Sequence, residues 1–309
     1  MILLLVDIGN TRVKWARLVD GRIGKLRAAA NEDWTVEDYA REVIGRGWVN
    51  AASGRPGVVA GRRSVVRVVA PAVRDSVERA VARGMRGSTR PGRPDTPEVN
   101  RIVVSSVAGS EVDQMLIGAA RQVGAPMPEF VVSQRSAGGV TTAYLEPWRL
   151  GVDRFVGAIG AHHLAADKPV CVVNVGTALT IDLVDDSGRH RGGAIVPGPA
   201  LMVDSLLKYT SGIRRRAQGG ASGANSLFAQ TTRTAIGQGA VYATAAVIDR
   251  AIEEAQKELG QVPLVMMTGG GSAAVKRLVR TPCVSVPDLV LHGLAVWASH
   301  TPLKRRRVN

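Results

Sequence analysis

Residues 170–206 read VCVVNVGTALTIDLVDDSGRHRGGAIVPGPALMVDSL. An apolar run ends at Asn174-Val175-Gly176-Thr177, and residues 178–184 then alternate between inward-type and outward-type side chains. This pattern predicts a β-hairpin, in which a glycine turn joins a buried strand to a half-buried one. Such a turn can point several backbone N–H groups at one anion. An ordinary hairpin has the same pattern, so this segment alone leaves both interpretations open.

The N-terminal residues 2–18, ILLLVDIGNTRVKWARL, repeat the same plan. An apolar run leads to Asp7-Ile8-Gly9-Asn10-Thr11, and an alternating strand follows. Asp7 and Asn174 each stand two residues before the glycine of their hairpin. Two such hairpins, half a chain apart, predict a two-lobed protein that handles phosphate groups from both sides. The Asp7 carboxylate suits a hard cation such as Mg²⁺.

The composition of the chain is that of a globular protein. It has 309 residues, of which 45% are hydrophobic, and this length predicts two domains. No apolar stretch reaches the roughly 18 residues that span a bilayer, and the first apolar run meets Asp7 at once, as a core strand would. Cys171 and Cys283 are the two cysteines, so no disulfide framework is implied. We therefore expect a cytoplasmic protein without a membrane partner.

The formal net charge of +14 raises the question of a nucleic-acid partner. Arginine gathers in four short segments, and the last is Lys304 to Arg307. Aromatic residues make up 4% of the chain, and few stand among these arginines to stack on bases. Attraction of anionic substrates and a general arginine bias explain the charge as well, so we expect no nucleic-acid partner.

The order of the expected elements indicates an α/β protein. In the first half, the hairpin is followed by an amphipathic helix, an Arg/Gly/Pro-rich insertion, a strand, a helix and a strand, at 32–46, about 50–100, 101–107, 111–123 and 129–132. In the second half, the hairpin is followed by a helix, a Gly/Arg/Ser loop, a long helix, a strand and a last helix, at 199–211, 212–226, 231–259, 264–267 and 291–298. The strand at 264–267 runs into Thr268-Gly269-Gly270-Gly271, a natural place for a nucleotide beside the next helix.

Asp153 and Arg154 stand at the start of a helix expected to run to about residue 166. A carboxylate there is favoured by the helix dipole, so a plain helix cap explains Asp153 on its own. An Asp-Arg pair at a helix start is also able to hold an anionic substrate. His162 and His163 follow, but no further Cys or His stands at ligand spacing, and we expect no metal there.

Six short motifs, taken together, resemble those of type III pantothenate kinases, within the acetate-and-sugar-kinase/Hsp70/actin superfamily. They occur in the family's order and cover nearly the whole chain except residues 50–100 and the basic tail. The motifs are Asp7-x-Gly9-Asn10-Thr11, Gly151-Val152-Asp153-Arg154, Gly176-Thr177-Ala178-x-Thr180-x-Asp182, Gly192-Gly193-x-Ile195-x-Pro197-Gly198, Thr232-x-x-Ala235-Ile236-x-x-Gly239 and Thr268-Gly269-Gly270.

The resemblance implies an α/β fold of two RNase H-like (actin-like ATPase) lobes with the active site in the cleft between them. The lobes would be residues 1–147, including the insertion, and residues 148–309. The implied reaction is ATP-dependent phosphorylation of pantothenate to 4′-phosphopantothenate, the first step of coenzyme A biosynthesis. The family is usually dimeric, so a homodimer is expected, with Mg²⁺ accompanying ATP and with K⁺ or NH₄⁺ as a monovalent cation.

The resemblance also implies roles for particular residues. Asp153 matches the general base. The ATP and phosphate site would consist of Asp7, Gly9, Asn10, Thr11, Lys14, Asn174, Gly176, Thr177, Gly269 and Gly270. Pantothenate would contact Tyr144, Gly151, Asp153, Arg154 and Thr232. Asp7 would hold the metal, and Asn174 stands at a second metal position.

Asn174 departs from the family pattern, because many members have Asp there. The amide keeps an acceptor oxygen but loses the charge. Asp182 stands on the same hairpin, an even number of residues away, and an unbulged strand would place both on one face. Two alternatives therefore stay open: a catalytically impaired paralogue that acts as a regulatory or binding protein, and a kinase of the superfamily with another hydroxylated substrate.

Overall fold

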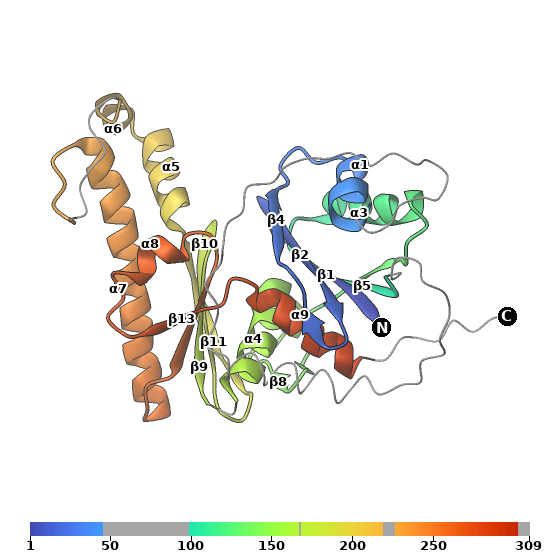
Figure 1. Cartoon of the computed structure of the whole chain (residues 1–309). Coiled ribbons are helices and arrows are strands. Elements are labelled where there is room, and N and C mark those ends of the chain that lie inside the picture. The colour runs from blue at the N-terminus through green and yellow to red at the C-terminus, as the bar shows by residue number, and fades with distance from the viewer. Residues whose placement is uncertain (46–98, 167, 219–225, 302–309) are drawn as a thin grey trace. The chain divides into compact units, whose positions relative to one another are not determined.

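The computed structural model describes residues 1–45, 99–166, 168–218 and 226–301 (Figure 1). Most of the insertion expected at about 50–100 and the basic tail at 304–307 lie outside these residues. Contacts divide the chain into two compact units. Unit 1 consists of residues 1–138, 146–164 and 290–309, and unit 2 of residues 139–145 and 165–289.

The sheet of unit 1 has the strand order β3-β2-β1-β5-β6. β1 (Ile2–Ile8) pairs with β2 (Arg12–Val19) in antiparallel fashion and with β5 (Arg101–Ser106) in parallel fashion. The outer strands are β3 (Arg22–Ile23) and β6 (Pro128–Phe130), and β4 (Arg27–Ala30) also pairs with β2. The hairpin predicted at residues 2–18 is therefore confirmed, and β1 is the central strand.

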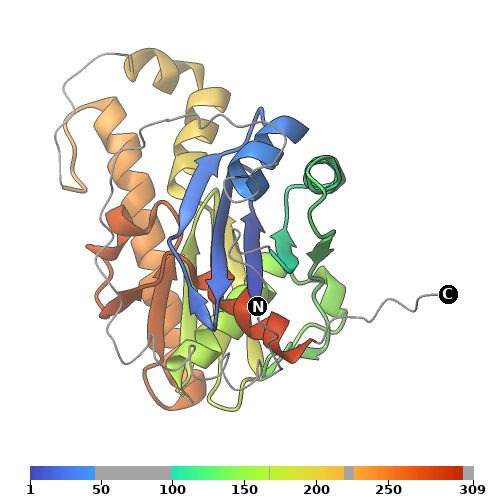
Figure 2. The ribbon, with the colours of Figure 1, turned by 45° about the vertical axis from the view of Figure 1, so that its right-hand side comes forward.

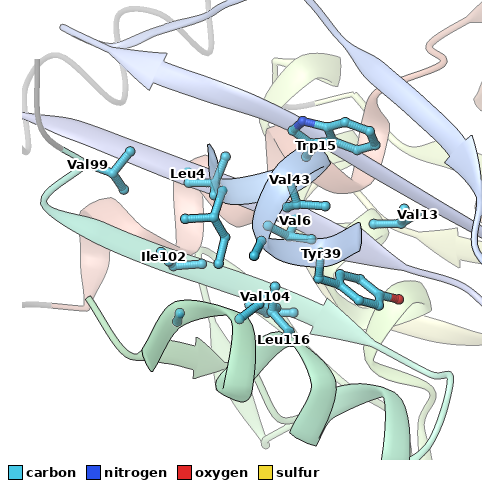
Figure 3. Packing of buried hydrophobic residues seen from close by; sticks show 14 of the residues in the cluster. Leu4, Val6, Val13, Trp15, Tyr39, Val43, Val99, Ile102, Val104 and Leu116 are labelled. Carbon is cyan, nitrogen blue, oxygen red and sulfur yellow. The ribbon is translucent and has the colours of Figure 1, made fainter. Parts of the chain in front are cut away.

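β1 is central because both of its faces are apolar. Leu4 and Val6 enter a core with Tyr39 and Val43 (Figure 3). Leu3 and Leu5, which alternate with them along the strand, are buried as well. Tyr39 and Val43 come from a helical segment made of α1 (Val36–Asp38) and η1 (Tyr39–Ile44), in place of the longer helix expected at 32–46.

Further helices among the described residues belong to unit 1. These are α3 (Ser110–Gln122), η3 (Pro147–Arg149) and α4 (Val152–Ala165), and α9 (Leu289–His300) joins them from the end of the chain. A β-carbon at Gly293 of α9 would lie 1.9 Å from the carbonyl oxygen of Val156 in α4, so these two helices touch through backbone. Arg101 of β5 donates hydrogen bonds to the carbonyl oxygens of Ala298 and Thr301.

The packing of α9 explains why the units differ from the boundary predicted between residues 147 and 148. Sequence order assigned the whole C-terminal half to one lobe, whereas α4 and α9 make their contacts within unit 1. Residues 139–145, which contain β8 (Val140–Thr141), belong instead to unit 2, although β7 (Ser136–Ala137) directly before them belongs to unit 1.

The sheet of unit 2 repeats the order of unit 1, as β11-β10-β9-β12-β13. β9 (Val170–Val175) is central and antiparallel to β10 (Ala178–Val184), which pairs with β11 (His190–Pro197). β12 (Leu264–Thr268) and β13 (Cys283–Ser285) continue the sheet in parallel. Both units thus have an RNase H-like sheet, which confirms the predicted fold class and the internal repeat.

The helix α7 (Thr232–Leu259) packs on one face of this sheet (Figures 1 and 2). Its Ala245, Ile248 and Ile252 meet the odd-numbered side chains of β9 and β10. α5 (Pro199–Tyr209) packs against α7, and α8 (Ser272–Lys276) follows β12. α6 (Ser211–Arg216) corrects the prediction that a loop begins at residue 212. Among the described helices, none combines the length and the apolar character needed to cross a membrane.

Candidate active site

A row of three polar side chains crosses the central strands of unit 1. Asp7 of β1 lies opposite Lys14 of β2 and opposite Ser105 of β5 in the strand register. Residues paired directly across neighbouring strands share a face of the sheet, so the three side chains stand side by side. The Ser105 hydroxyl is buried and has no hydrogen-bond partner within the described part of the chain. Sequence analysis did not identify Ser105 as a site residue.

The environment of Asp7 raises the pKa of its carboxyl group from 3.8 to about 6. Burial, which removes water from the charged form, is the largest cause. The Lys14 ammonium lowers the pKa and the Asp153 carboxylate raises it, so both charges act on Asp7 within unit 1. Asp7, Lys14 and Asp153 come from three different segments and were expected at one site. The structure shows that their charges interact.

Asp153 lies in the first turn of α4, as the sequence predicted. Its Oδ1 accepts a hydrogen bond of 2.8 Å from the backbone N–H of Arg154. A β-carbon at Gly151 would lie 2.9 Å from the same oxygen, so glycine leaves room for the carboxylate. Asp153 is half-buried, and the Arg154 side chain is buried.

The turn after Asp7 is tight and accessible. The Gly9 N–H donates a hydrogen bond of 2.9 Å to the carbonyl oxygen of Arg12. Asn10 and Thr11, between them, are exposed. These residues thus lie beside Asp7 with their polar groups open to solvent, in the place expected for a phosphate loop.

Unit 2 carries a matching row, but its members are uncharged. Asn174 of β9 lies opposite Thr180 of β10 and Thr268 of β12. A β-carbon at Gly269 would lie 2.6 Å from Asn174 Oδ1 and 2.3 Å from the Val175 carbonyl oxygen, so only glycine fits. Gly269 also has φ +93°, where other residues are strained. Asn174 therefore occupies the position that Asp7 has in unit 1.

Gly198 packs against the turn after Asn174. The sequence did not indicate Gly198 as a site residue. Gly176 and Thr177 are exposed, and the Gly198 N–H donates a hydrogen bond of 2.9 Å to the Thr177 carbonyl oxygen. A β-carbon at Gly198 would lie 2.2 Å from the Gly176 carbonyl oxygen. The spacing Pro-Gly-Pro before α5 is the sequence signal for this close approach.

The remaining expected residues lie on other parts of unit 2. Gly270 is exposed beside Gly269, at the end of β12. Thr232 is the first residue of α7. Tyr144 is half-buried and follows β8. Contacts therefore group Asn174, Gly269 and the Gly176 turn, while Thr232 and Tyr144 come from separate elements.

Asp182 shares the sheet face of Asn174, as the parity of the two positions predicted. Its register partner on β9 is Val172, which lies two residues before Asn174 and on the same face of the sheet. The Asp182 carboxylate accepts a hydrogen bond from His190 Nε2 at 2.8 Å, and both side chains are buried. Asp182 is thus engaged with His190, and it does not replace the carboxylate that Asn174 lacks.

The donor set fits a cation that arrives with a nucleotide. Within the described residues, no group of three or more His, Cys, Asp or Glu side chains is placed to hold a metal ion. Mg²⁺ in phosphate-transferring proteins usually takes one or two carboxylates, with water and phosphate oxygens as its other ligands. The Asp7 carboxylate could supply one such ligand, and the Ser105 hydroxyl, which has no hydrogen-bond partner among the described residues, lies opposite it in the strand register.

The raised pKa of Asp7 predicts a pH-dependent stability difference in protein freed of divalent cations. In the unfolded chain Asp7 loses its proton near pH 3.8, whereas the folded protein keeps it to about pH 6. Asp7 therefore stabilises the folded state, relative to higher pH, below pH 3.8. This contribution to the free energy of unfolding is lost as the pH rises to 6. Asp7→Asn should be more stable than the parent above pH 6, by at most about 3 kcal/mol.

Urea unfolding of both proteins between pH 3.5 and 8 measures this difference. The two free energies of unfolding should converge below pH 4. Asp20→Asn is the matched control, because the Asp20 side chain is 84% exposed. A stability difference between Asp7→Asn and the parent that does not change with pH would contradict the prediction.

Comparison with known proteins gives the chain its family. A family model described as type III pantothenate kinase matches residues 85–254. Among solved structures, component A of (R)-2-hydroxyglutaryl-CoA dehydratase from Acidaminococcus fermentans is 11% identical, covers 97% of each chain and gives a TM-score of 0.46.

Full-length relatives agree with the family model. A type III pantothenate kinase of Nitrosococcus oceani is 31% identical over 312 residues, which cover 100% of this chain and 98% of that protein. One of Janthinobacterium sp. is 32% identical over 306 residues, 97% of this chain and 99% of that protein. The chain therefore belongs to the type III pantothenate kinase family.

Proposed function

We propose that this protein transfers the γ-phosphoryl group of ATP to the primary hydroxyl of pantothenate, giving 4′-phosphopantothenate and ADP. Family membership supports the two substrates. The structural observation that carries the proposal is that the charges of Lys14 and Asp153 both act on the Asp7 carboxyl group within unit 1. In this arrangement the Asp7 carboxylate binds a cation, the Lys14 ammonium binds phosphate and the Asp153 carboxylate takes the proton.

Asp153 is the general base in this proposal. It takes the proton of the pantothenate hydroxyl as that oxygen forms a bond to the γ-phosphorus, and the bond from the γ-phosphorus to its bridging oxygen breaks as ADP leaves. The hydrogen bond from the Arg154 N–H fixes one oxygen of this carboxylate at the start of α4. Positioning and charge account for most of the rate of phosphoryl transfer, and a base adds about 10²–10⁴.

The phosphates of ATP are assigned to the two glycine turns and to Lys14. Backbone N–H groups in such turns can donate hydrogen bonds to an anion, so no charged side chain is required. Asp7 would hold the Mg²⁺ that accompanies ATP, with Ser105 beside it. The ion, when bound, neutralises charge on the phosphate oxygens. Gly269 and Gly270 allow close approach of the nucleotide to backbone.

Arg154, Tyr144, Gly151 and Thr232 are assigned to pantothenate. The planar guanidinium of Arg154 suits the pantothenate carboxylate, since it can donate two parallel hydrogen bonds. Tyr144 offers a ring edge and a hydroxyl for the apolar and polar parts of the substrate.

Asp153→Asn tests the assignment of the base. The amide keeps the size of the side chain and cannot take a proton, so kcat should fall at least about 10²-fold in a coupled ADP-release assay with pantothenate, K⁺ and Mg²⁺. Asp38→Asn is the control, because Asp38 belongs to the capping box of α1 and is not among the assigned residues. Its kcat should stay within about twofold of that of the parent. An inactive parent, with NH₄⁺ and other nucleotides also tried, would favour the binding-protein alternative.

Asn174→Asp tests whether this position faces a cation. A charge about 4 Å from a cation is worth on the order of 4 kcal/mol at an effective dielectric constant of about 20, before desolvation. We therefore expect half-maximal activity at a lower Mg²⁺ concentration. Asn100→Asp is the control, since Asn100 belongs to unit 1, where it accepts a hydrogen bond from the Ile2 N–H, and it is not among the assigned residues. Unchanged cation dependence would remove Asn174 from the cation site.

A homodimer completes the proposal, and exposed apolar side chains of unit 2 support it. β11 is an edge strand with Ile195 64% exposed, and α5 exposes Leu206 and Tyr209, the latter at 76%. A second copy seated on this surface would remove these side chains from water. Tyr209→Asp combined with Leu206→Asp should yield monomers in light scattering, whereas Val262→Asp, at another exposed apolar position, should not. A monomeric parent would refute the dimer.

A further inference from the structure

We propose that the buried pair Asp182–His190 is a positioning unit that fixes Tyr144 for binding of the acceptor substrate, acting through Thr142. The proposal rests on the proposed function, because it takes Tyr144 as a pantothenate contact. All four residues belong to unit 2. Of these four, the sequence assigned only Tyr144 to the site.

A continuous chain of hydrogen bonds leads from Asp182 to Tyr144. His190 Nε2 lies 2.8 Å from Asp182 Oδ1, and His190 Nδ1 lies 3.5 Å from the Thr142 hydroxyl. The Thr142 hydroxyl oxygen accepts a hydrogen bond of 3.2 Å from the backbone N–H of Tyr144. The Tyr144 ring also lies against the His190 ring, with centroids 6.0 Å apart and planes at 35°.

We infer the following arrangement of protons for these three hydrogen bonds. A neutral imidazole with its proton on Nε2 donates to Asp182 and accepts at Nδ1 from the Thr142 O–H. The Thr142 oxygen is then left to accept from Tyr144. The carboxylate thus sets the imidazole tautomer, and the tautomer sets the direction of the Thr142 hydroxyl.

A β-bulge brings His190 to the face of Asp182. Leu183 pairs with Gly192, but Val184 pairs with His190, so Arg191 is the extra residue. Without the bulge, Val184 would pair with Arg191, and His190 would point to the other face. Gly192 accommodates the irregularity at φ +119°. Bulges often re-aim a side chain beside an active site.

The network holds the segment of residues 139–145. In residues 139–145, Val140 and Thr142 are buried, Tyr144 is half-buried and the other four are exposed. The Thr141 N–H also donates a hydrogen bond of 3.0 Å to the Gly188 carbonyl oxygen. Thr142, at 3% exposure, is therefore the side-chain anchor next to Tyr144.

Stability alone is a weak reason for this network. Removing a carboxylate and an imidazole from water is costly, and well-packed apolar residues often serve as well or better. At 2% and 1% exposure, Asp182 and His190 are almost fully removed from water. A directed chain that ends on Tyr144 gives the pair a function that apolar side chains cannot supply.

Thr142→Val tests the proposal, because it removes the hydroxyl and nearly keeps the shape. The KM for pantothenate should rise about 5–30-fold, the loss expected for one or two hydrogen bonds, while the KM for ATP stays within twofold. Thr142→Ser should restore most of the affinity. His190→Gln keeps a donor for Asp182 but lacks the Nδ1 acceptor, so it should raise the KM similarly. The double variant should show less than the product of the two increases.

Thr244→Val is the matched control. The Thr244 hydroxyl is buried in unit 2 and donates to the Ala240 carbonyl oxygen, outside the network. Its loss should lower the melting temperature without changing the KM for pantothenate. Unchanged KM in Thr142→Val, or an equal rise in the KM for both substrates, would overturn the proposal.

Histidine NMR separates this proposal from the proposed function. In ¹⁵N-labelled protein His190 should show the Nε2–H tautomer, and Thr142→Val should shift its Nδ1 resonance. If the parent does not phosphorylate pantothenate, the proposed function fails, and these resonances still decide whether the network exists. An Nδ1–H tautomer would refute the network even in an active enzyme.

Discussion

The organisation of this protein depends on how the central strand of each sheet ends. A strand buried on both faces has no place for a polar side chain until its last residues, where the neighbouring helices no longer cover it. Asp7 stands at this position in β1, and Asn174 stands there in β9. The next residues must turn sharply, and glycine permits this. A polar side chain and a glycine turn are thus brought together by the same structural requirement.

The two units use this arrangement with different charge. In unit 1 the row across the strands contains Lys14, Asp7 and Ser105, and burial makes the Asp7 carboxylate hold its proton to about pH 6. A cation beside Asp7 would favour the ionised form, so the apo fold carries an unfavourable charge that binding relieves. In unit 2 the row contains threonine and asparagine, and no such electrostatic penalty arises there. Strong cation binding is accordingly expected of unit 1 more than of unit 2.

Much of the fold followed from the sequence because the decisive elements are local. Hairpins with a period of two and a glycine turn predicted β1–β2 and β9–β10, and a carboxylate before an apolar periodic run predicted the start of α4. The unit boundary was not predictable in this way. It depends on contacts between α4 and α9, which are separated by more than a hundred residues and are joined through the backbone at Gly293.

The same distinction applies to the site. Asp182 is an acidic residue inside an otherwise apolar alternation, which signals a buried partner, but the identity of that partner depends on a one-residue bulge at Arg191. Nothing in the spacing of the sequence fixes such a bulge. Tyr144 and Asp153 stand nine positions apart in the chain, yet contacts assign the first to unit 2 and the second to unit 1. The placement of these two residues therefore depends on different packing interactions, which their closeness in the sequence does not reveal.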